Sequence, residues 1–238
     1  MDRKYKTIAK VCGFLFVWMA VLFTLTAAVY GIAGNGDLLA REMLRHAPPE
    51  ATGLPEKEYG GVGRMTAGYL TGQEAVFQYT FSDGEDRVYL CFQSHEAEHM
   101  TDCRGLISLA GTLRWITGGA ALILISAGLL FRRERREYAG GMFTGLCAAG
   151  IVISGLVAWA VIDFDGLFTT FHRVAFTNEG WLLNPRTDLL IRLMPVSFFI
   201  ALAARLALWL MAVVLAAGAV AWTMTKTGGN VQVHGEKL

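Results

Sequence analysis

Four long apolar runs constrain the fold of this chain more than any other feature of its sequence. They cover residues 11–33, 105–131, 139–162 and 195–224, and the only charges inside them are Arg114 and Arg205. A helix rises about 1.5 Å per residue, so each run can cross a hydrocarbon core of about 30 Å. The sequence therefore predicts a mainly α-helical membrane protein with four transmembrane helices.

The composition agrees with this fold class. The 238 residues are 54% hydrophobic and 17% charged, which is too apolar for a soluble domain of this length. A net charge of +1 gives no basis for a nucleic-acid partner. The first run could also be read as a secretory signal peptide, but such a peptide has an apolar core of about 7–15 residues, so we favour an uncleaved span.

Basic residues predict how the chain is oriented. Lysines and arginines precede the first run, cluster at Arg132–Arg136 and follow the fourth run at Lys226. Such residues are enriched on the cytoplasmic side, and four spans place both termini there. The expected order is cytoplasmic 1–10, transmembrane 11–33, extracytoplasmic 34–104, transmembrane 105–131, cytoplasmic 132–138, transmembrane 139–162, extracytoplasmic 163–194, transmembrane 195–224 and a disordered cytoplasmic tail 225–238.

The segment 34–104 is the one sizeable polar piece, and we expect a small α+β domain there. Prolines and glycines between residues 48 and 63 predict loop, and Arg64–Leu70 predicts a short helix. Alternating apolar residues in Gln73–Phe92, with a turn signal at Ser82–Gly84, predict a β-hairpin. The piece is too small for its own core, so it should pack on the spans or on 163–194. A disulfide between its cysteines, Cys91 and Cys103, is possible.

The stretch Ser94–Arg104 carries the densest candidate chemistry. His95-Glu96-Ala97-Glu98-His99 matches HExxH, in which two histidines one helical turn apart bind zinc and the glutamate serves as a base. Asp102 is too close to complete such a site, although His172 or Glu179 could do so from the later loop. The alternative is a solvated, acidic helix start without function.

The same stretch also suits acid/base chemistry without metal. His99 and Asp102 are three residues apart and share a helix face, where a carboxylate can orient an imidazole. A second histidine, His172, lies in a stripe of phenylalanines at Phe164, Phe168 and Phe171 that predicts an interfacial helix. No GxSxG motif occurs, so general acid/base work by histidines is the favoured chemistry.

Arg114 and Arg205 lie at about the same depth, roughly 26 Å from the cytoplasmic ends of their spans. They either extend to the outer headgroups or line a cavity in which they hold a lipid ester or an oxyanion. If Ser94–Phe131 forms one straight helix, His99 lies about 22 Å beyond Arg114. The helix then bends near Gly105 or Gly111, or Arg114 lies inside the hydrocarbon core.

Two stretches resemble the lipoprotein intramolecular transacylases, a family of four-span bacterial membrane enzymes. The first, Glu96-x-x-His99-Met100-x-Asp102-Cys103-Arg104, is similar to the family's E-x-x-H-M-x-D-V-K. The second carries Asp163-Phe164-Asp165, Phe168, Phe171-His172, Phe176, Asn178, Trp181-Leu182, Pro185, Asp188, Leu190-Ile191, Pro195 and Phe198-Phe199. The departures are Cys103 where valine is usual, Glu179-Gly180 and Val196, and none removes a histidine.

The resemblance implies acyl transfer in the bacterial cytoplasmic membrane, with the active site on its outer face. The substrates would be diacylglyceryl-modified lipoproteins among membrane lipids, with no cofactor or metal. One acyl ester would move to the α-amine of the lipid-bearing N-terminal cysteine, giving a lyso-form lipoprotein. The catalytic residues would be His99, His172 and Asp102, with Asp102 orienting His99. Substrate contacts are expected from Asn178, Trp181, Asp188, Arg192, Arg114, Arg205 and Tyr69.

His95 is not a position of the family motif, which weakens the zinc interpretation. Two alternatives stay open at this point. One is a membrane zinc metallopeptidase that uses His95 and His99. The other is a non-catalytic membrane protein whose outer domain binds a partner.

Overall fold

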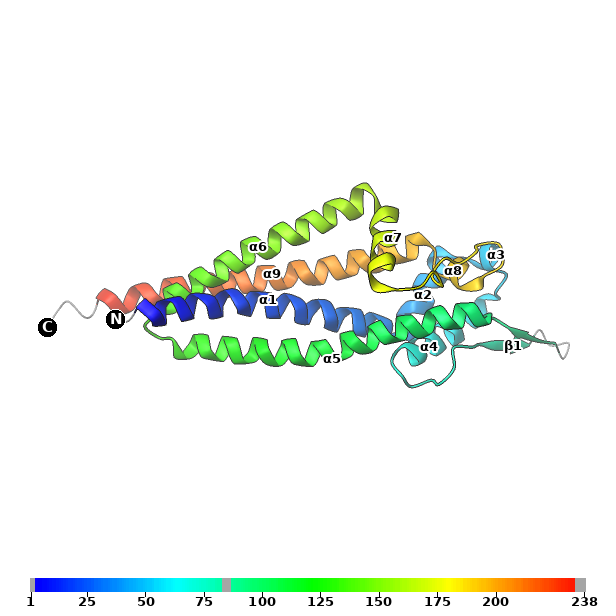
Figure 1. Cartoon of the computed structure of the whole chain (residues 1–238), viewed down its shortest axis with the longest axis horizontal. Coiled ribbons are helices and arrows are strands. Elements are labelled where there is room, and N and C mark those ends of the chain that lie inside the picture. Colours follow the sequence, from blue (N-terminus) through cyan, green and yellow to red (C-terminus); the bar gives the residue numbers. More distant parts are fainter. Residues whose placement is uncertain (1–2, 83–86, 234–238) are drawn as a thin grey trace. The chain divides into compact units, whose positions relative to one another are not determined.

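The computed structural model describes residues 3–82 and 87–233, with side chains as far as Thr225. The chain is mainly helical and carries one two-stranded sheet (Figure 1). Its elements are α1 (Arg3–Ala33), α2 (Gly36–His46), α3 (Pro49–Thr52), the 3-10 helix η1 (Glu56–Glu58), α4 (Tyr59–Leu70), β1 (Thr80–Ser82), β2 (Val88–Leu90), α5 (Ser94–Leu130), α6 (Arg135–Ile162), α7 (Phe164–Ala175), α8 (Leu189–Leu193) and α9 (Val196–Val233).

Helices α1, α5, α6 and α9 are long and apolar enough to cross a membrane. Between 6% and 17% of the residues in their most apolar stretches are buried inside the protein. Large apolar side chains such as Leu130, 84% exposed, and Ile162, 83% exposed, point outward from them. Apolar surface on this scale suits contact with lipid rather than water. The four predicted apolar helices are thus confirmed.

All four helices extend beyond the predicted apolar runs, and α5 and α9 extend furthest. Helix α5 begins at Ser94, so the histidine stretch and the second apolar run form one helix of 37 residues. That helix is about 55 Å long, well beyond a hydrocarbon core of about 30 Å, so its polar first eleven residues extend past the apolar part that begins at Gly105. Helix α9 runs to Val233 through part of the predicted tail, because a formed helix gains one hydrogen bond per added residue. Residues 234–238 of that tail lie outside the described residues.

The chain divides into two compact units. The first comprises residues 1–26, 112–159 and 207–238, and so holds parts of α1, α5, α6 and α9. Its core surrounds Tyr138, which is fully buried and donates its hydroxyl to the Leu124 carbonyl at 3.0 Å. Helices α1 and α6 approach closely in this unit, and a Cβ on Gly141 would overlap the Lys10 carbonyl oxygen. Small residues permit such close backbone contact.

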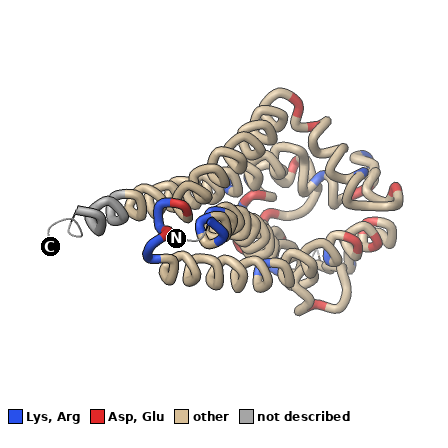
Figure 2. The backbone as a smooth tube through the Cα atoms, turned by 60° about the vertical axis from the view of Figure 1, so that its left-hand side comes forward, with Lys and Arg blue, Asp and Glu red and all other residues tan. Residues whose placement is uncertain are grey.

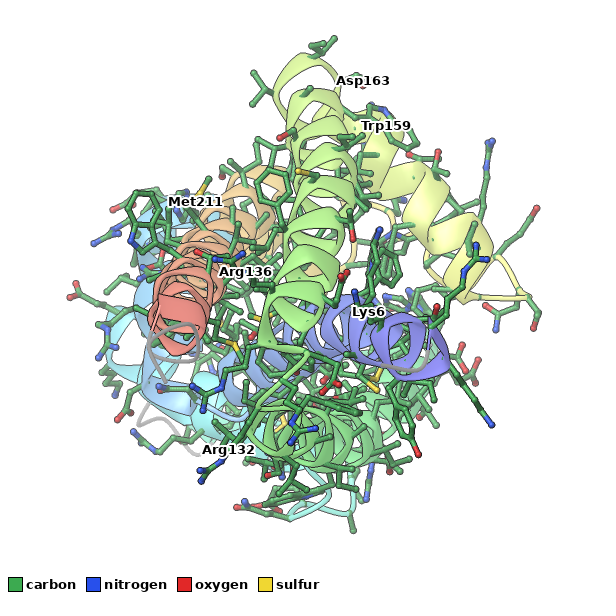
Figure 3. All side chains as sticks on the ribbon, turned by 90° about the vertical axis from the view of Figure 1, so that its left-hand side faces the viewer. Lys6, Arg132, Arg136, Trp159, Asp163 and Met211 are labelled. Atoms are coloured by element: carbon green, nitrogen blue, oxygen red, sulfur yellow. The ribbon has the colours of Figure 1, made fainter. Side chains whose placement is uncertain are left out.

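Basic side chains gather at one end of this first unit. Figure 2 shows lysine and arginine positions at the start of α1 and in the connection between α5 and α6. Viewed from that end, Lys6, Arg132 and Arg136 lie around the ends of α1 and α6 (Figure 3). The clusters that predicted the cytoplasmic side are therefore close together in space.

The second unit, residues 27–111 and 160–206, is built around its own hydrophobic core. Fully buried Met43, Val62 and Leu193 from α2, α4 and α8 meet there. Phe77 and Phe92, which flank the hairpin, join them with ring centroids 4.6 Å apart. The polar piece therefore packs on the segment after the third span, as its small size predicted.

Several local predictions need correction or completion. Part of the region 48–63 that predicted loop is helical, since α3, η1 and the start of α4 lie in it. Helix α2 precedes it, with Asn35 as its cap and the apolar residues Leu39 and Met43 on one face. The hairpin is confirmed, with Thr80 opposite Leu90, Phe81 opposite Tyr89 and Ser82 opposite Val88. Positions 83 and 84 of its predicted turn lie outside the described residues. All four cysteines are free, so Cys91 and Cys103 are not paired.

The contact between Gly141 and Lys10 generates a stability prediction. Gly141→Ala should destabilise the protein by about 1–3 kcal/mol, because the added methyl group meets backbone that cannot rotate away. Thermal unfolding in detergent micelles measures the effect. Gly140→Ala is the matched control, since a Cβ at that position meets nothing within 4 Å beyond the neighbouring backbone of its own helix. Equal unfolding temperatures for the two variants would contradict the close α1–α6 packing.

Candidate functional site

Two histidines from distant parts of the chain face each other in the second unit. His99 lies in the second turn of α5 and His172 near the end of α7, and their ring centroids are 6.1 Å apart. Their exposures are 8% and 7%, so both imidazoles are buried. The Asp163 carboxylate accepts from the Gly166 amide at 2.8 Å and so fixes where α7 starts.

Aromatic rings surround His172. Phe168, Trp181 and Phe176 lie with centroids 4.1, 5.1 and 5.4 Å from the imidazole. Phe176 also lies 5.3 Å from His99 and so contacts both histidines. These apolar walls exclude water from the imidazoles. The predicted phenylalanine stripe of α7 therefore has a second role, since Phe168 covers the histidine beside it.

The structure fixes the tautomer of His172. Its Nδ1 lies 2.7 Å from the Phe168 carbonyl oxygen, which can only accept, so Nδ1 carries the hydrogen. Nε2 of the neutral ring then holds a lone pair and is a proton acceptor. Burial lowers the pKa of His172, although the hydrogen bond to Phe168 opposes the shift.

His99 is held differently. Its Nε2 lies 3.6 Å from the Sγ atom of Cys103, one helical turn later, and its buried Nδ1 has no hydrogen-bond partner. The pKa of His99 is lowered by burial and by the neighbouring His172, against an opposing effect of the Asp102 charge. A buried polar atom without a partner is uncommon in a folded protein and is available to a ligand.

Asp102 does not make its expected hydrogen bond to His99. Its Oδ2 accepts from Nδ2 of Asn178 at 2.9 Å, and the Asn178 Oδ1 accepts from the Gly180 amide at 2.9 Å. The i, i+3 spacing places Asp102 near His99, but Asn178 lies in reach of the carboxylate because the chain turns back after α7. Asp102 thus ties α5 to the segment that carries Trp181.

His95 and Glu96 face away from the histidine pair. His95 Nε2 lies 2.9 Å from Asp188 Oδ2. Both carboxyl oxygens of Glu96 accept backbone hydrogen bonds, from Leu190 at 2.7 Å and Gln93 at 2.8 Å. The three polar residues of the HExxH match therefore have separate partners and do not converge on one point. Within residues 3–82 and 87–233, no three His, Cys, Asp or Glu side chains are grouped to hold a metal.

The other expected substrate contacts have varied surroundings. Trp181 lies beside His172, and Asn178 is bonded to Asp102, as described above. Buried Asp188 accepts from Thr187 Oγ1 at 2.6 Å and from the Asn184 amide at 2.8 Å, besides its contact with His95. Arg192 donates to the Thr52 carbonyl at 3.2 Å and so links α8 to α3. Asp188 and Arg192 are thus occupied by protein groups.

Three further residues that were expected to contact the substrate also have protein partners. Arg205 donates to the buried Glu42 carboxylate of α2, so its charge is paired. The Tyr69 hydroxyl lies 2.9 Å from Thr101 Oγ1, and the Arg104 guanidinium stacks 5.0 Å above its ring. Arg114 belongs to the first unit, where its guanidinium lies 5.2 Å from the Trp115 ring.

Two contacts of functional interest are not among those predicted from the sequence. Cys103 lies four residues after His99, the spacing at which side chains on a helix meet, so its contact could have been predicted. The partnership of Glu42 with Arg205 spans 163 positions and carries no local signal.

Comparisons with known protein families and solved structures show what this chain is similar to. A family model described as the lipoprotein intramolecular transacylase Lit matches residues 14–199. A solved structure of the membrane-integral transacylase Lit from Bacillus cereus is similar with a TM-score of 0.74 at 17% identity, covering 93% of this chain and 97% of that chain. Two structures of its histidine variants have TM-scores of 0.65 at 15% identity, covering 93% of this chain and 93% and 95% of theirs. No curated protein matches the chain.

The structural likeness demonstrates a shared membrane fold, at identities too low to demonstrate more. The family model covers well over half of the chain, and it includes both histidines and the turns between them. With its four apolar helices, this chain is a multi-pass membrane protein that belongs to the lipoprotein intramolecular transacylase family.

Proposed function

We propose that this protein moves an acyl chain within a diacylglyceryl-modified lipoprotein. The acceptor is the α-amine of the lipid-bearing N-terminal cysteine, and the donor is an ester of the same molecule's glyceryl group. The single observation that carries the proposal is the buried pair His99 and His172, 6.1 Å apart between apolar walls. Holding both reacting groups on one substrate molecule supplies much of the required proximity.

The reaction needs two proton movements and no outside reagent. The amine nitrogen attacks the ester carbonyl carbon, a C–N bond forms and the amine loses one proton. The C–O bond to the glyceryl oxygen then breaks, and that oxygen takes up one proton. The products are an amide and a free hydroxyl, so atoms and charge balance without a cofactor. Two imidazoles within reach of one substrate suit this exchange.

His172 is the better candidate for the base. Its Nδ1 hydrogen is engaged by the Phe168 carbonyl, so the Nε2 lone pair is available to remove the amine proton. The same carbonyl stabilises the charged imidazolium that results, as a hydrogen-bond acceptor placed behind a catalytic histidine does. His99 then faces the ester oxygen and stabilises the charge that develops on it.

Asn178 and Trp181 complete the proposed site. Only one hydrogen of the Asn178 amide is used in its bond to Asp102, and the second can donate to the developing oxyanion. The Trp181 ring, 5.1 Å from His172, offers an apolar surface for an acyl chain or the cysteine thioether. Asp102 acts as a positioning residue that holds Asn178.

The proposed orientation places this site outside the cytoplasm. Lys6, Arg132 and Arg136 lie at one end of the first unit (Figure 3), where the positive-inside rule predicts cytoplasm. Residues 34–104 and 163–194 are then extracytoplasmic, and diacylglyceryl lipoproteins on the outer face would reach the histidines. Of the two arginine candidates in the spans, Arg205 is paired with Glu42, so only Arg114 would act through its charge near the headgroups.

The catalytic assignment can be tested by substitution. His99→Gln and His172→Gln should each lower the rate of N-acylation at least about 100-fold, because each removes a proton-transfer group. Mass spectrometry of a diacylated reporter lipopeptide incubated with purified protein in lipid measures conversion. His95→Gln is the matched control, since glutamine can still bond Asp188, and it should convert within a few-fold of the unsubstituted protein. Full conversion by either of the first two variants would refute the assignment, and loss on His95→Gln would favour the zinc alternative.

The pKa directions predict how the histidines titrate. Burial favours the neutral form of His99 and His172 and lowers the pKa of each, so both should titrate below pH 6.5, the ordinary pKa of histidine. His95 should titrate above it, because the Asp188 hydrogen bond raises its pKa. The three titrations can be followed by NMR of ¹⁵N-histidine-labelled protein, with each signal assigned by its loss in a His→Gln variant. A midpoint above pH 6.5 for His172 would contradict the buried site.

Reporter fusions test the orientation. Alkaline phosphatase folds outside the cytoplasm, where its disulfides form, so it should be active when fused after Gln73 and inactive after Arg133. A fluorescent protein fused after Arg133, which matures in the cytoplasm, controls for expression of the inactive fusion. The reverse pattern of activity would overturn the proposed sidedness.

A further inference from the structure

The contact between Cys103 and His99 is a chemical feature of this chain that the proposed function does not use. Cys103 stands where the resembling family usually has valine, so it is a local addition to the site. Its Sγ lies 3.6 Å from Nε2 of His99, and among the described residues no other group bonds that ring. Asp102, which could have oriented the imidazole, is bonded to Asn178 instead.

The direction of this hydrogen bond follows from the two groups. The buried thiol stays protonated, because burial and the Asp102 charge raise the pKa of Cys103 to about 12. A neutral imidazole nitrogen is a good acceptor, whereas a thiol sulfur is a weak one. The favourable arrangement therefore has the thiol donating to the Nε2 lone pair, and the ring hydrogen then belongs to Nδ1.

We propose that Cys103 is a positioning residue that holds His99 in its Nδ1–H tautomer and leaves that N–H free to donate to the substrate's ester oxygen. The Nδ1 atom is buried and has no hydrogen-bond partner within the protein, so its hydrogen can bond a substrate oxygen. His172 is held in the complementary state, with Nε2 as acceptor. The two imidazoles thus face the substrate as one acceptor and one donor.

This assignment rests on the proposed function and specifies which nitrogen of His99 donates to the substrate. His172 takes the amine proton at Nε2, and His99 donates from Nδ1 to the carbonyl oxygen as negative charge develops. After the C–O bond breaks, the protonated His172 supplies the proton to the glyceryl oxygen. Each imidazole returns to its starting state, so the cycle closes without a net change in the protein. The thiol forms and breaks no bond.

The test is the tautomer of His99 in the purified full-length protein. ¹⁵N chemical shifts separate a protonated ring nitrogen from one with a lone pair, and the His99 signals are assigned by their loss in His99→Gln. In the unsubstituted protein, Nδ1 should carry the hydrogen. Cys103→Val, which replaces the thiol with an apolar side chain that cannot donate, should shift a substantial part of the population to Nε2–H.

Cys91→Val is the matched control. Cys91 is also a buried free thiol of the second unit, and it belongs to the hydrophobic core without a described bond to either histidine, so its replacement should leave the His99 shifts unchanged. A second measurement covers activity. Because a weak hydrogen bond is lost and the imidazole remains, Cys103→Val should slow N-acylation only about two- to fivefold.

The possible outcomes separate this inference from the proposed function. If His99 carries its hydrogen on Nε2 in the unsubstituted protein, or if Cys103→Val leaves its tautomer unchanged, the role of Cys103 is refuted even when the reporter lipopeptide is converted. If the tautomer responds as expected but the unsubstituted protein does not convert the lipopeptide, the proposed function fails and the hydrogen bond stands.

Discussion

The second unit depends on the two hydrogen bonds that the buried carboxyl group of Glu96 accepts. Glu96 is fully buried, and its two oxygens accept the amides of Gln93 and Leu190. One bond caps the start of α5 and the other caps α8, which lies 94 residues later in the chain. Hydrogen bonds to a charged acceptor contribute about 1.5–3 kcal/mol each, and a buried carboxylate without them would be strongly unfavourable.

That link sets the position of the catalytic candidates. His99 follows Glu96 by one turn on the same helix, while His172 belongs to the segment that α8 closes. Two further contacts connect α5 to the segment between α7 and α8. His95 contacts Asp188, and Asp102 accepts a hydrogen bond from Asn178. Polar contacts between the same two segments thus hold the two imidazoles with their ring centroids 6.1 Å apart. The glutamate of the HExxH match therefore has a structural role, because its carboxyl oxygens accept backbone hydrogen bonds rather than a hydrogen bond from a metal-bound water.

Much of the fold could be predicted because lipid imposes simple rules on a sequence. Apolar runs of the right length predict spans, and each of the four long helices contains nearly all of one run. The small domain was harder to predict, because its glycines and prolines indicate loop while Gly36–His46 and Tyr59–Leu70 are helices. Those helices are stabilised by packing of Met43 and Val62 in a core shared with α8, which no local pattern reveals.

The sequence by itself determined the membrane class, the four spans, the two histidine segments and the family, since these depend on composition, run length and local motifs. Only the tertiary structure decided which partners the polar groups take. It paired Asp102 with Asn178, Arg205 with Glu42, and His99 with Cys103. It also fixed the tautomer of His172 through a backbone carbonyl. The physical reason is that hydrogen bonds act over about 3 Å, so their partners are set by how distant segments meet in space rather than by spacing along the chain.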